Sequence, residues 1–502
     1  MNGPTSLCTF ERIVDDAGVA PQIEALLPVG VRPRQLRVRT LLVGILLALL
    51  DGRPAHLSRA HAALVALDED DRRRLGVIVE WKCGTHLLTY RQTEYTVGLI
   101  EEALGKDCPD GEPTDIVQRL ADDLVEVSIP VHYKQATSAL AVDWTDVESF
   151  ARPPLKEGAQ TADPEASWGH RRGNGPGQKD ELFYGYYLQL ATTVHEEGGA
   201  AVPELVRRLL LTNCHVDPPP AFVTVLENMA ASGVALGDVL ADSGYAHRVA
   251  AHWALPLRAL GAELIMDLHP HDRGTQGTFA GAICWNGNLY CPATPAALFT
   301  IEPLARGAGE AETVAHDRRS AELARYKLGR ITADDADGFH RVACPAVLGK
   351  VRCPRRAASM ALSNERPEIM HTPEEPPTCC TQKTLTVPPS VNAKTRQKHD
   401  YPSKAHRLSY GRRSAAERSN STVKDPASND ISRGWCRLMG LTSMTLMLTC
   451  LFVVRNQRVM ASFEGRQAED QRRQALGLGP TTRRRRRKTV ADLVASSANA
   501  PP

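Results

Sequence analysis

"TSALAVDWTDVESF", residues 137–150, is the stretch that decides the fold class. Its apolar half predicts a short buried strand, and the strand closes on an acid, Asp143. The stretches "ELFYGYYLQLATTV" and "AVPELVRRLLLTN" continue the strand pattern, and "PPAFVTVLENMAASGV" follows as a helix with proline in its first turn. In "LGDVLADSGYAH" another apolar strand runs into Asp242 and a Ser-Gly turn. Strands alternating with helices predict an α/β domain.

The length and charge of the chain suggest several units and an anionic partner. At 502 residues the chain is long enough for three or four domains. The formal charge of +2 is unevenly distributed, because residues 455–488 hold 11 Lys or Arg against 3 Asp or Glu. We expect this end, which includes "RRRRRK" at 483–488, to meet a polyanion or to stay solvated.

Twelve cysteines without an N-terminal signal peptide indicate reduced thiols and a cytoplasmic protein. The two apolar runs, residues 41–50 and 441–454, are shorter than the roughly 20 residues that a membrane-spanning helix requires. They therefore predict buried helices of a soluble protein that has no membrane contact.

A second informative stretch is "YGRRSAAERSNSTVK", residues 410–424. At 100° per residue, a helix brings Tyr410, Arg413, Glu417 and Lys424 into an arc of roughly 60° on one face. Four polar groups of different kinds then point outward together, which predicts a functional face rather than a packing face.

Asp143, Asp242 and Glu417 are candidate metal ligands. Hard divalent cations such as Mg²⁺ prefer carboxylate oxygens, and converging carboxylates repel one another unless a cation joins them. A single acid at a strand end is more often a turn or cap residue, and Glu417 alone could be a solvated helix residue. The combination of two strand-end acids with the polar helix face favours a metal site.

The spacing of Tyr410, Arg413, Glu417 and Lys424 resembles the Y-R-E-K signature of bacterial cut-and-paste insertion-sequence transposases of the DDE type. In that family the first acid lies in a strand like "AVDWT" and the second in a segment like "LADSGY". The resemblance covers roughly residues 137–456. The helix is its most specific part, "ADSGY" is less specific, and "AVDWT" is weak by itself.

The resemblance implies a ribonuclease-H-like core, a five-stranded mixed sheet flanked by helices. It further implies that Asp143, Asp242 and Glu417 are catalytic and hold two Mg²⁺ ions, for which Mn²⁺ can substitute. Such a pair of ions supports cleavage of transposon ends and their joining to target DNA by phosphoryl transfer. The partners are then double-stranded DNA, at the transposon ends and at the target, and a second copy of the chain when DNA is bound. The location implied is the bacterial cytoplasm, at the nucleoid.

The resemblance also implies roles for the other three residues of the signature. Arg413 and Lys424 would contact DNA phosphates, since arginine suits bidentate phosphate binding and lysine acts as a point charge. Tyr410 would offer its hydroxyl or its ring to the DNA backbone. The helix face is then polar because its partner is a phosphodiester.

The domain organisation expected is a helical N-terminal domain, a catalytic core in two parts, a subdomain inserted between the second and third acids, and a basic tail. The boundaries are 1–130, 131–275, 276–404, 405–460 and 461–502, where the second and fourth ranges form the core. The inserted range accounts for the 174 residues between Asp242 and Glu417. The tail is expected to be disordered or only partly helical.

Several alternatives stay open at this stage. The N-terminal domain is either a DNA-binding unit, with Thr85 as a helix cap and Thr89 pointing outward, or an ordinary helical bundle. Six cysteines between Cys284 and Cys380 either supply four thiolates to a structural Zn²⁺ or remain free, since none forms a CxxC pair. The functional rivals are a transposase-derived DNA-binding protein without turnover and a ribonuclease-H-like nuclease without strand transfer.

Overall fold

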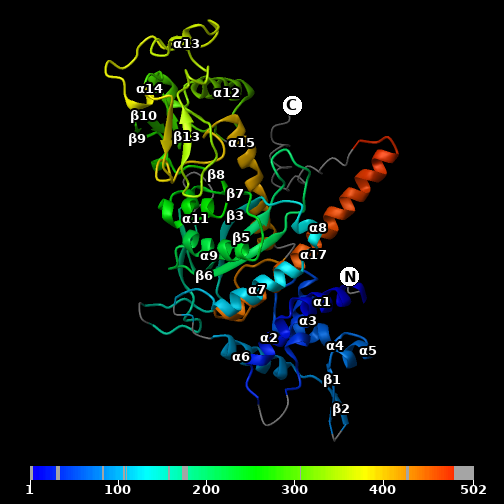
Figure 1. Ribbon diagram of the computed structural model, residues 1–502. Helices are drawn as coiled ribbons and strands as arrows, with labels where there is room; N and C mark the ends of the chain where they lie inside the picture. Colours follow the sequence, from blue (N-terminus) through cyan, green and yellow to red (C-terminus); the bar gives the residue numbers. More distant parts are fainter. Residues whose placement is uncertain are drawn as a thin grey trace, which may run out of the picture.

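The computed structural model describes most of the chain, and its helices and strands are labelled in Figure 1. The described residues are 4–29, 34–81, 84–105, 108, 110–156, 159–171, 179–305, 307–425 and 429–479. The basic run at 483–488 lies outside them.

A six-stranded mixed sheet forms the centre of the molecule (Figure 1). Strand β3 lies in its middle, antiparallel to β5 and parallel to β7, and β8 continues the parallel side. Both β4 and β6 pair with β5, along its first and second halves respectively. The predicted α/β domain with a mixed sheet is therefore confirmed. The strands are β3 (Leu140–Glu148), β4 (Ser167–Arg171), β5 (Glu181–Thr193), β6 (Val206–Asn213), β7 (Asp238–Ala241) and β8 (Glu263–Met266).

Helices cover both faces of this sheet. Successive residues of a strand point to opposite faces, so Val142 packs among the side chains of α9 and α11, whereas Ala141 packs against α16. Both faces are buried, which explains why β3, β5 and β7 read as nearly continuous apolar runs. The helical elements of the core are α9 (Pro218–Ala231), α10 (Ser243–Ala246), η1 (Ala250–His252), α11 (Ala254–Ala259), α15 (Lys404–Tyr410), η4 (Gly411–Arg413) and α16 (Ser414–Lys424).

The N-terminal unit is helical, as expected, but it also contains a β-hairpin (Figure 1). Thr85 lies in the second hairpin strand rather than at a helix cap. The helix begins after Thr89, which forms a capping box with Gln92, because both side chains satisfy backbone N–H groups of the first turn. The elements are α1 (Pro4–Ala17), α2 (Val19–Leu26), α3 (Val38–Leu49), α4 (Leu57–Val65), α5 (Glu69–Arg74), β1 (Ile78–Trp81), β2 (Gly84–Leu87), α6 (Tyr90–Leu104), α7 (Asp115–Val127) and α8 (Val131–Lys134).

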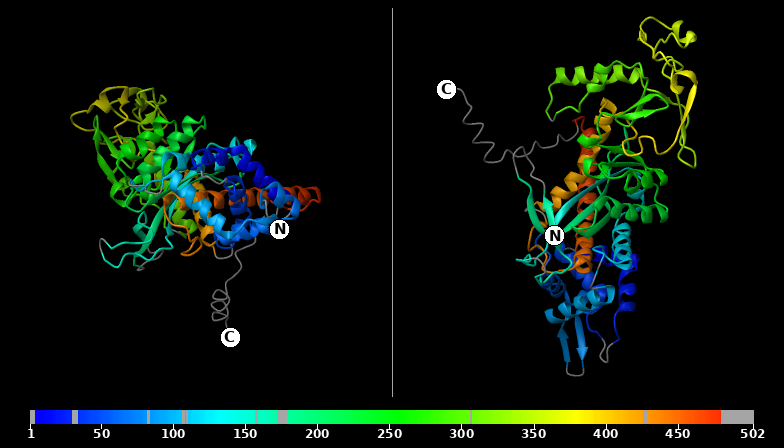
Figure 2. Two further views of the ribbon diagram at one scale, coloured as in Figure 1. Left: turned by 90° about the horizontal axis from the view of Figure 1, so that it is seen from below. Right: turned by 90° about the vertical axis from the view of Figure 1, so that its left-hand side faces the viewer.

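One long helix, α17 (Leu441–Ala475), joins the N-terminal unit to the sheet (Figure 2). The apolar runs 41–50 and 441–454 are buried helices, as predicted, and α17 packs against α3, α7 and β6. A single apolar cluster contains side chains of the N-terminal helices, one face of the sheet and α17. The helix continues through residues 461–475 of the predicted tail, where Gln, Glu, Arg and Ala favour helix.

The segment between β8 and α15 forms a separate lobe at the end of the molecule opposite the N-terminal unit (Figures 1 and 2). It contains two three-stranded antiparallel sheets and two apolar clusters of its own. No helix of the described residues combines the length and the apolar character needed to cross a membrane. The elements of the lobe are η2 (Pro270–Asp272), β9 (Thr275–Phe279), β10 (Ala282–Trp285), β11 (Asn288–Tyr290), η3 (Ala296–Thr300), α12 (Glu310–Arg325), β12 (Gly329–Arg330), β13 (His340–Ala343), α13 (Ala357–Met360), α14 (Thr378–Thr381) and β14 (Thr384–Val387).

Candidate functional site

Asp143 and Asp242 lie on neighbouring segments of the sheet. Asp143 is inside β3, which continues to Glu148, rather than at the end of the strand as predicted, whereas Asp242 directly follows β7. Strands β3 and β7 are parallel neighbours, with Ala141 beside Leu240. Continuing that register by two residues places Asp143 beside Asp242, and the two carboxyl groups are close enough for their charges to interact. Asp242 is also a cap residue, because its Oδ1 accepts the backbone N–H of Gly244 at 2.9 Å.

Aromatic packing holds the "ADSGY" turn against β3. The ring of Tyr245 lies 4.7 Å from that of Trp144 and 4.6 Å from that of Trp253, and its hydroxyl donates to Gln189 Oε1 at 3.2 Å. A Cβ atom at Gly244 would lie 2.5 Å from the Trp144 ring and 3.0 Å from Asp242 Oδ1. Glycine is therefore required there for steric reasons, and the turn delivers Asp242 to a fixed position.

The third acid arrives on α16, which approaches the sheet closely because its inner face is small. Ala415 and Ala416 are buried against β3 and β7. This approach lets Asn420 Nδ2 donate to Asp143 Oδ2 at 3.1 Å. Glu417 therefore comes close enough to Asp143 for their charges to interact, although 174 residues separate it from Asp242 in sequence.

Arg413 contacts two of the three acids. Its Nη1 lies 3.7 Å from Asp143 Oδ1, and its Nη2 forms an ion pair with Glu417. Burial raises the pKa of the Asp143 carboxyl to about 6; the Arg413 guanidinium opposes this shift, whereas the charges of Asp242 and Glu417 add to it. The site thus concentrates more negative charge than Arg413 alone neutralises.

A cavity of about 670 Å³ opens at this site, between the core and the inserted lobe. Asp242, Arg413 and Glu417 line it on the side of the core. The segment around Pro303 to Ala305 lines it on the side of the lobe. A larger cavity of about 960 Å³ lies on the other side of α16, away from the acids, so volume alone does not identify the candidate site.

Tyr410 also lines the cavity, and its ring has two close partners. It stacks on the buried imidazole of His406 with ring centroids 5.5 Å apart, and the Arg413 guanidinium lies 5.6 Å from the Tyr410 ring centroid. Burial raises the pKa of the Tyr410 hydroxyl, so Tyr410 meets any ligand as a neutral phenol. His406 in turn donates from Nε2 to the Met266 carbonyl oxygen at 2.9 Å.

We expect His406 to make the stability of the fold depend on pH. Burial lowers the pKa of its imidazole from 6.5 to about 4, so the unfolded chain binds a proton in this interval that the folded chain does not. The free energy of unfolding therefore falls as the pH decreases from about 6.5 to about 4, by on the order of 2 kcal/mol from this residue. Urea unfolding at several pH values, compared with His406→Gln, measures this contribution; identical pH profiles would contradict it.

The sequence predicts that Lys424 reaches the cavity on the same helix face as Glu417, but Lys424 lies elsewhere. It is seven residues further along α16, about 10 Å at 1.5 Å per residue, and it lies outside the cavity lining. Its Nζ donates to Asp146 Oδ1 at 2.7 Å. Burial acts to raise the pKa of Asp146, but the adjacent Arg171 and Lys424 hold it below its usual value.

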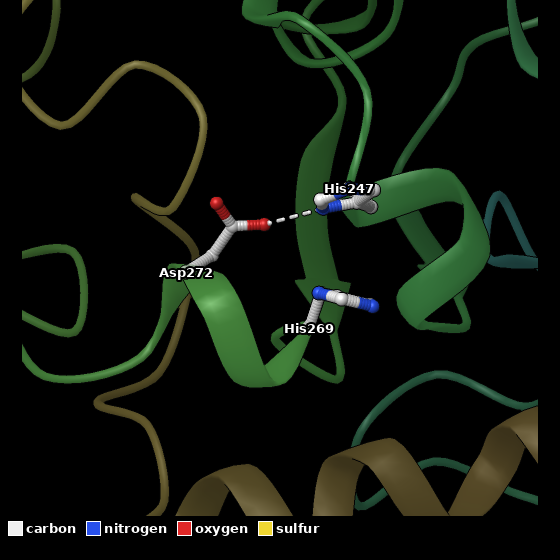
Figure 3. A group of neighbouring side chains, drawn as sticks. All are labelled: His247, His269 and Asp272. Carbon is white, nitrogen blue, oxygen red and sulfur yellow. Dashed lines mark hydrogen bonds and ion pairs between the residues drawn. The ribbon is translucent and has the colours of Figure 1, made fainter.

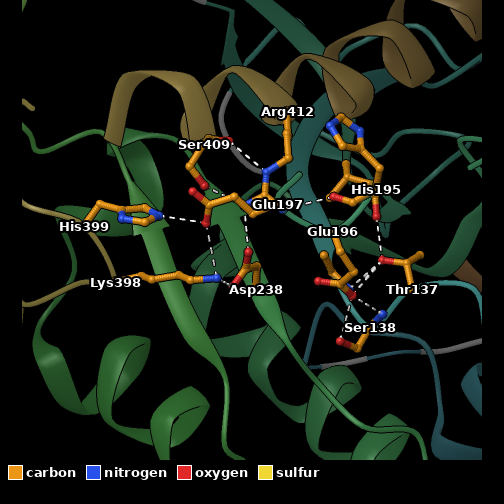
Figure 4. A network of polar contacts seen from close by, with 12 residues as sticks. Thr137, Ser138, His195, Glu196, Glu197, Asp238, Lys398, His399, Ser409 and Arg412 are labelled. Atoms are coloured by element: carbon orange, nitrogen blue, oxygen red, sulfur yellow. Dashed lines mark hydrogen bonds and ion pairs between the residues drawn. The ribbon is translucent and has the colours of Figure 1, made fainter. Parts of the chain in front are cut away.

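A buried ion pair that the sequence did not suggest fixes the helix carrying the signature (Figure 4). Arg412 Nη2 donates to Asp238 Oδ2 at 2.7 Å, and both side chains are 4% exposed. Lys398 donates to the other oxygen of Asp238 at 2.7 Å. Asp238 begins β7 and Asp242 follows its end, so Arg412 ties η4 to the strand that delivers the second acid. The only feature of the sequence that could have pointed to this ion pair is Arg412 itself, a second arginine directly before Arg413.

The donor set of the three acids fits hard divalent cations, because it consists of carboxylates only and carries excess negative charge. Binding such an ion requires Arg413 to exchange its carboxylate partners for another anion. In the inserted lobe, burial raises the pKa of Cys291 to about 12, and the charges of nearby Cys344 and Cys380 add to the shift. Structural zinc at these cysteines remains a prediction.

One group of three side chains in the described part of the chain brings potential metal-ligand atoms within 4.8 Å of one another. It consists of His247, His269 and Asp272, none of which the sequence singled out (Figure 3). The separation of three residues between His269 and Asp272 was a feature of the sequence that could have suggested the group. The third member, His247, lies on another segment of the chain.

Comparisons of the chain with protein-family models, with curated proteins and with solved structures returned no match. The functional argument therefore rests on the geometry of the acids, of Arg413 and of the cavity beside them.

Proposed function

We propose that the protein is a DDE-type transposase that cuts the ends of an insertion sequence and joins them to target DNA. The observation that carries the proposal is the position of Arg413, which contacts Asp143 and Glu417 beside Asp242. These three acids come from two strands and a distant helix. Like charges are rarely brought together in this way without a cationic ligand or a catalytic role.

The arrangement of the strands supports a ribonuclease-H-like core. Strands β3, β5 and β6 are antiparallel to one another in chain order, and β7 and β8 follow them as strands parallel to β3. Asp143 lies on β3, and Asp242 directly follows β7. Strand β4 is an addition along the first half of β5. The inserted lobe lies between the second and third acids in sequence, as the resemblance requires, and it forms one wall of the cavity.

In the proposed reaction Asp143, Asp242 and Glu417 would hold divalent cations. When bound, such ions activate a water molecule and stabilise the leaving 3′ oxygen. Asn420 orients the Asp143 carboxylate through its hydrogen bond, and the cap contacts of Gly244 orient Asp242. These residues thus fix the carboxylates before DNA arrives.

Arg413 is the residue that would respond to DNA. A phosphate can accept the same paired N–H donors that a carboxylate accepts, so the guanidinium can transfer from Asp143 and Glu417 to the DNA backbone. This transfer would free carboxylate oxygens for cations at the moment when substrate is bound. Tyr410, fixed by His406, would present its neutral hydroxyl to the same strand.

Lys424 and the basic tail would supply further phosphate contacts away from the cavity. Lys424 and Arg171 both form ion pairs with Asp146, which places two cations on this part of the surface. The tail residues 483–488 would add affinity that is independent of sequence and decreases with salt. Double-stranded DNA bound across two copies of the chain remains part of this proposal.

The test is to incubate the full-length protein with Mg²⁺ and DNA that carries the sequences flanking its own gene. We expect cleavage that leaves 3′ hydroxyl ends, followed by covalent joining of these ends to a supercoiled plasmid. Chelation of the metal should abolish both steps. Cleavage without joining would instead identify a nuclease, and salt-dependent binding without cleavage would identify a DNA-binding protein; either result contradicts the proposal.

A further inference from the structure

A group of histidines and an aspartate lies on the segments that follow β7 and β8. His247 comes directly after α10, whereas His269 caps the turn η2 and Asp272 is its last residue (Figure 3). Because β7 and β8 are parallel neighbours, both segments leave the sheet at the same edge. The ligand atoms of the three side chains lie within 4.8 Å of one another.

The local backbone keeps His269 and Asp272 close together. Pro270 starts a 3₁₀ turn, with His269 as its cap residue. The turn is only three residues long, so His269 before it and Asp272 at its end remain close neighbours. His247 approaches from the other segment, with its ring centroid 4.0 Å from that of His269 and its Nδ1 3.2 Å from Asp272 Oδ2.

We propose that His247, His269 and Asp272 bind one zinc ion. Two imidazoles and one carboxylate form a three-residue donor set that zinc uses in proteins, with the fourth position left to water. Imidazole nitrogen favours zinc over magnesium, so the site differs in chemistry from the all-carboxylate group of Asp143, Asp242 and Glu417. Zinc binding here does not depend on whether the protein cuts DNA.

The surroundings of the aspartate match those of a ligating carboxylate. Lys394 Nζ donates to Asp272 Oδ1 at 2.7 Å and leaves Oδ2 facing His247. Ligating carboxylates are commonly held by such a second hydrogen bond, which fixes their orientation. A bound ion would replace two longer contacts, the 3.2 Å contact of His247 and the 3.3 Å hydrogen bond that His269 Nδ1 accepts from the His271 backbone.

The ion would act as a clamp beside the candidate site. His247 is five residues after Asp242, and His269 is two residues after Asp267, which lines the same cavity and accepts the Tyr401 hydroxyl at 2.7 Å. Joining these two segments restricts the movement of the turn that carries the second acid. The expected effect of zinc is therefore to hold together the two segments that follow the parallel strands β7 and β8.

The experiment measures zinc directly. The full-length protein is stripped with a chelator and titrated with zinc against a chromogenic competitor, in parallel with His247→Gln and Asp272→Asn. Because cysteines elsewhere can also bind zinc, the informative quantity is the difference between the wild-type and variant isotherms. We expect each variant to lose one equivalent, with the dissociation constant of that site increased more than about 100-fold, beyond the effect of losing an outer hydrogen bond.

Two matched variants distinguish a metal site from a general histidine effect. His271→Gln changes a neighbouring imidazole outside the ligand set, and we expect its isotherm to match the wild type. Lys394→Met removes the hydrogen bond to Asp272 together with a positive charge, and because that charge opposes a bound cation, we expect a smaller increase in the dissociation constant than Asp272→Asn causes. The proposal is overturned if His247→Gln binds as much zinc as the wild type, or if His271→Gln loses the same equivalent.

Cobalt substitution identifies the donor atoms. With one equivalent of Co²⁺ the protein should show visible ligand-field bands without sulfur-to-cobalt charge transfer, and His247→Gln should lose these bands. A charge-transfer spectrum that persists in His247→Gln would assign the tight site to the cysteines and would overturn the proposal. Circular dichroism of each variant checks that the fold is retained, since His247 is exposed and outside the core.

Discussion

Asp143→Asn, Asp242→Asn and Glu417→Gln are each expected to reduce metal-dependent DNA cleavage by more than about a thousandfold, while DNA binding stays within about threefold of the wild type. Each change removes one ionised oxygen donor but keeps the size of the side chain. Asp242→Asn also retains an oxygen that can cap α10 through Gly244, so a loss of activity would reflect charge rather than unfolding. Gel-based cleavage and fluorescence anisotropy measure the two quantities.

Glu148→Gln is the matched control for this series. Glu148 lies on the same strand as Asp143, and its carboxylate pairs with Arg171 at 2.8 Å rather than with Arg413. We expect this variant to cleave DNA at a rate close to that of the wild type. Full cleavage by any one of the three acid variants would remove that acid from the catalytic group, and equal losses in Glu148→Gln would point to a general effect on the strand.

Phe452→Ala is expected to destabilise the whole protein by about 3–5 kcal/mol, because it removes a fully buried aromatic ring from α17. Phe452 belongs to the cluster that joins the N-terminal helices, the sheet and α17. The N-terminal unit and the sheet should therefore lose stability together rather than one after the other. Urea unfolding followed by circular dichroism and by tryptophan fluorescence should give two coincident transitions, both shifted to lower urea.

Gln474→Ala provides the comparison on the same helix. Gln474 is exposed near the end of α17, and we expect its replacement to change the free energy of unfolding by less than about 0.5 kcal/mol. A cost below about 1 kcal/mol for Phe452→Ala would mean that α17 does not pass through the core, since buried Phe→Ala changes cost several times more. Separate transitions for the two probes would mean that the N-terminal unit has a core of its own.

Local patterns were sufficient for the central strands and for the helix of the signature. The apolar residues before Asp143 and Asp242 specify strands that are buried on both faces, and the sheet contains both strands, although β3 continues past Asp143 to Glu148. Residues 410–424 are helical throughout, although Gly411–Arg413 forms a 3₁₀ turn. Periodicity depends on neighbouring residues only, so the sequence alone is enough to predict it.

The direction of a side chain on a helix is also local, but its partner is not. The angular spacing brought Arg413 and Glu417 together as an i, i+4 pair. The same spacing placed Lys424 on that face, yet two turns of rise carry it to Asp146 rather than to the cavity. An angle around the axis specifies a face, whereas the contact depends on how far the helix extends along the neighbouring strand.

Tertiary structure alone decided the features that join distant segments. The order of the strands brings Asp143 beside Asp242, and the buried pair of Arg412 with Asp238 fixes the helix that carries Glu417. The group of His247 with Asp272 forms only because two parallel strands end at one edge of the sheet. The sequence by itself determined the secondary structure around the site and the kinds of side chain available, because these follow from neighbours along the chain. Which of those side chains meet was determined by the pairing of strands and the packing of α16, which depend on contacts between residues far apart in sequence.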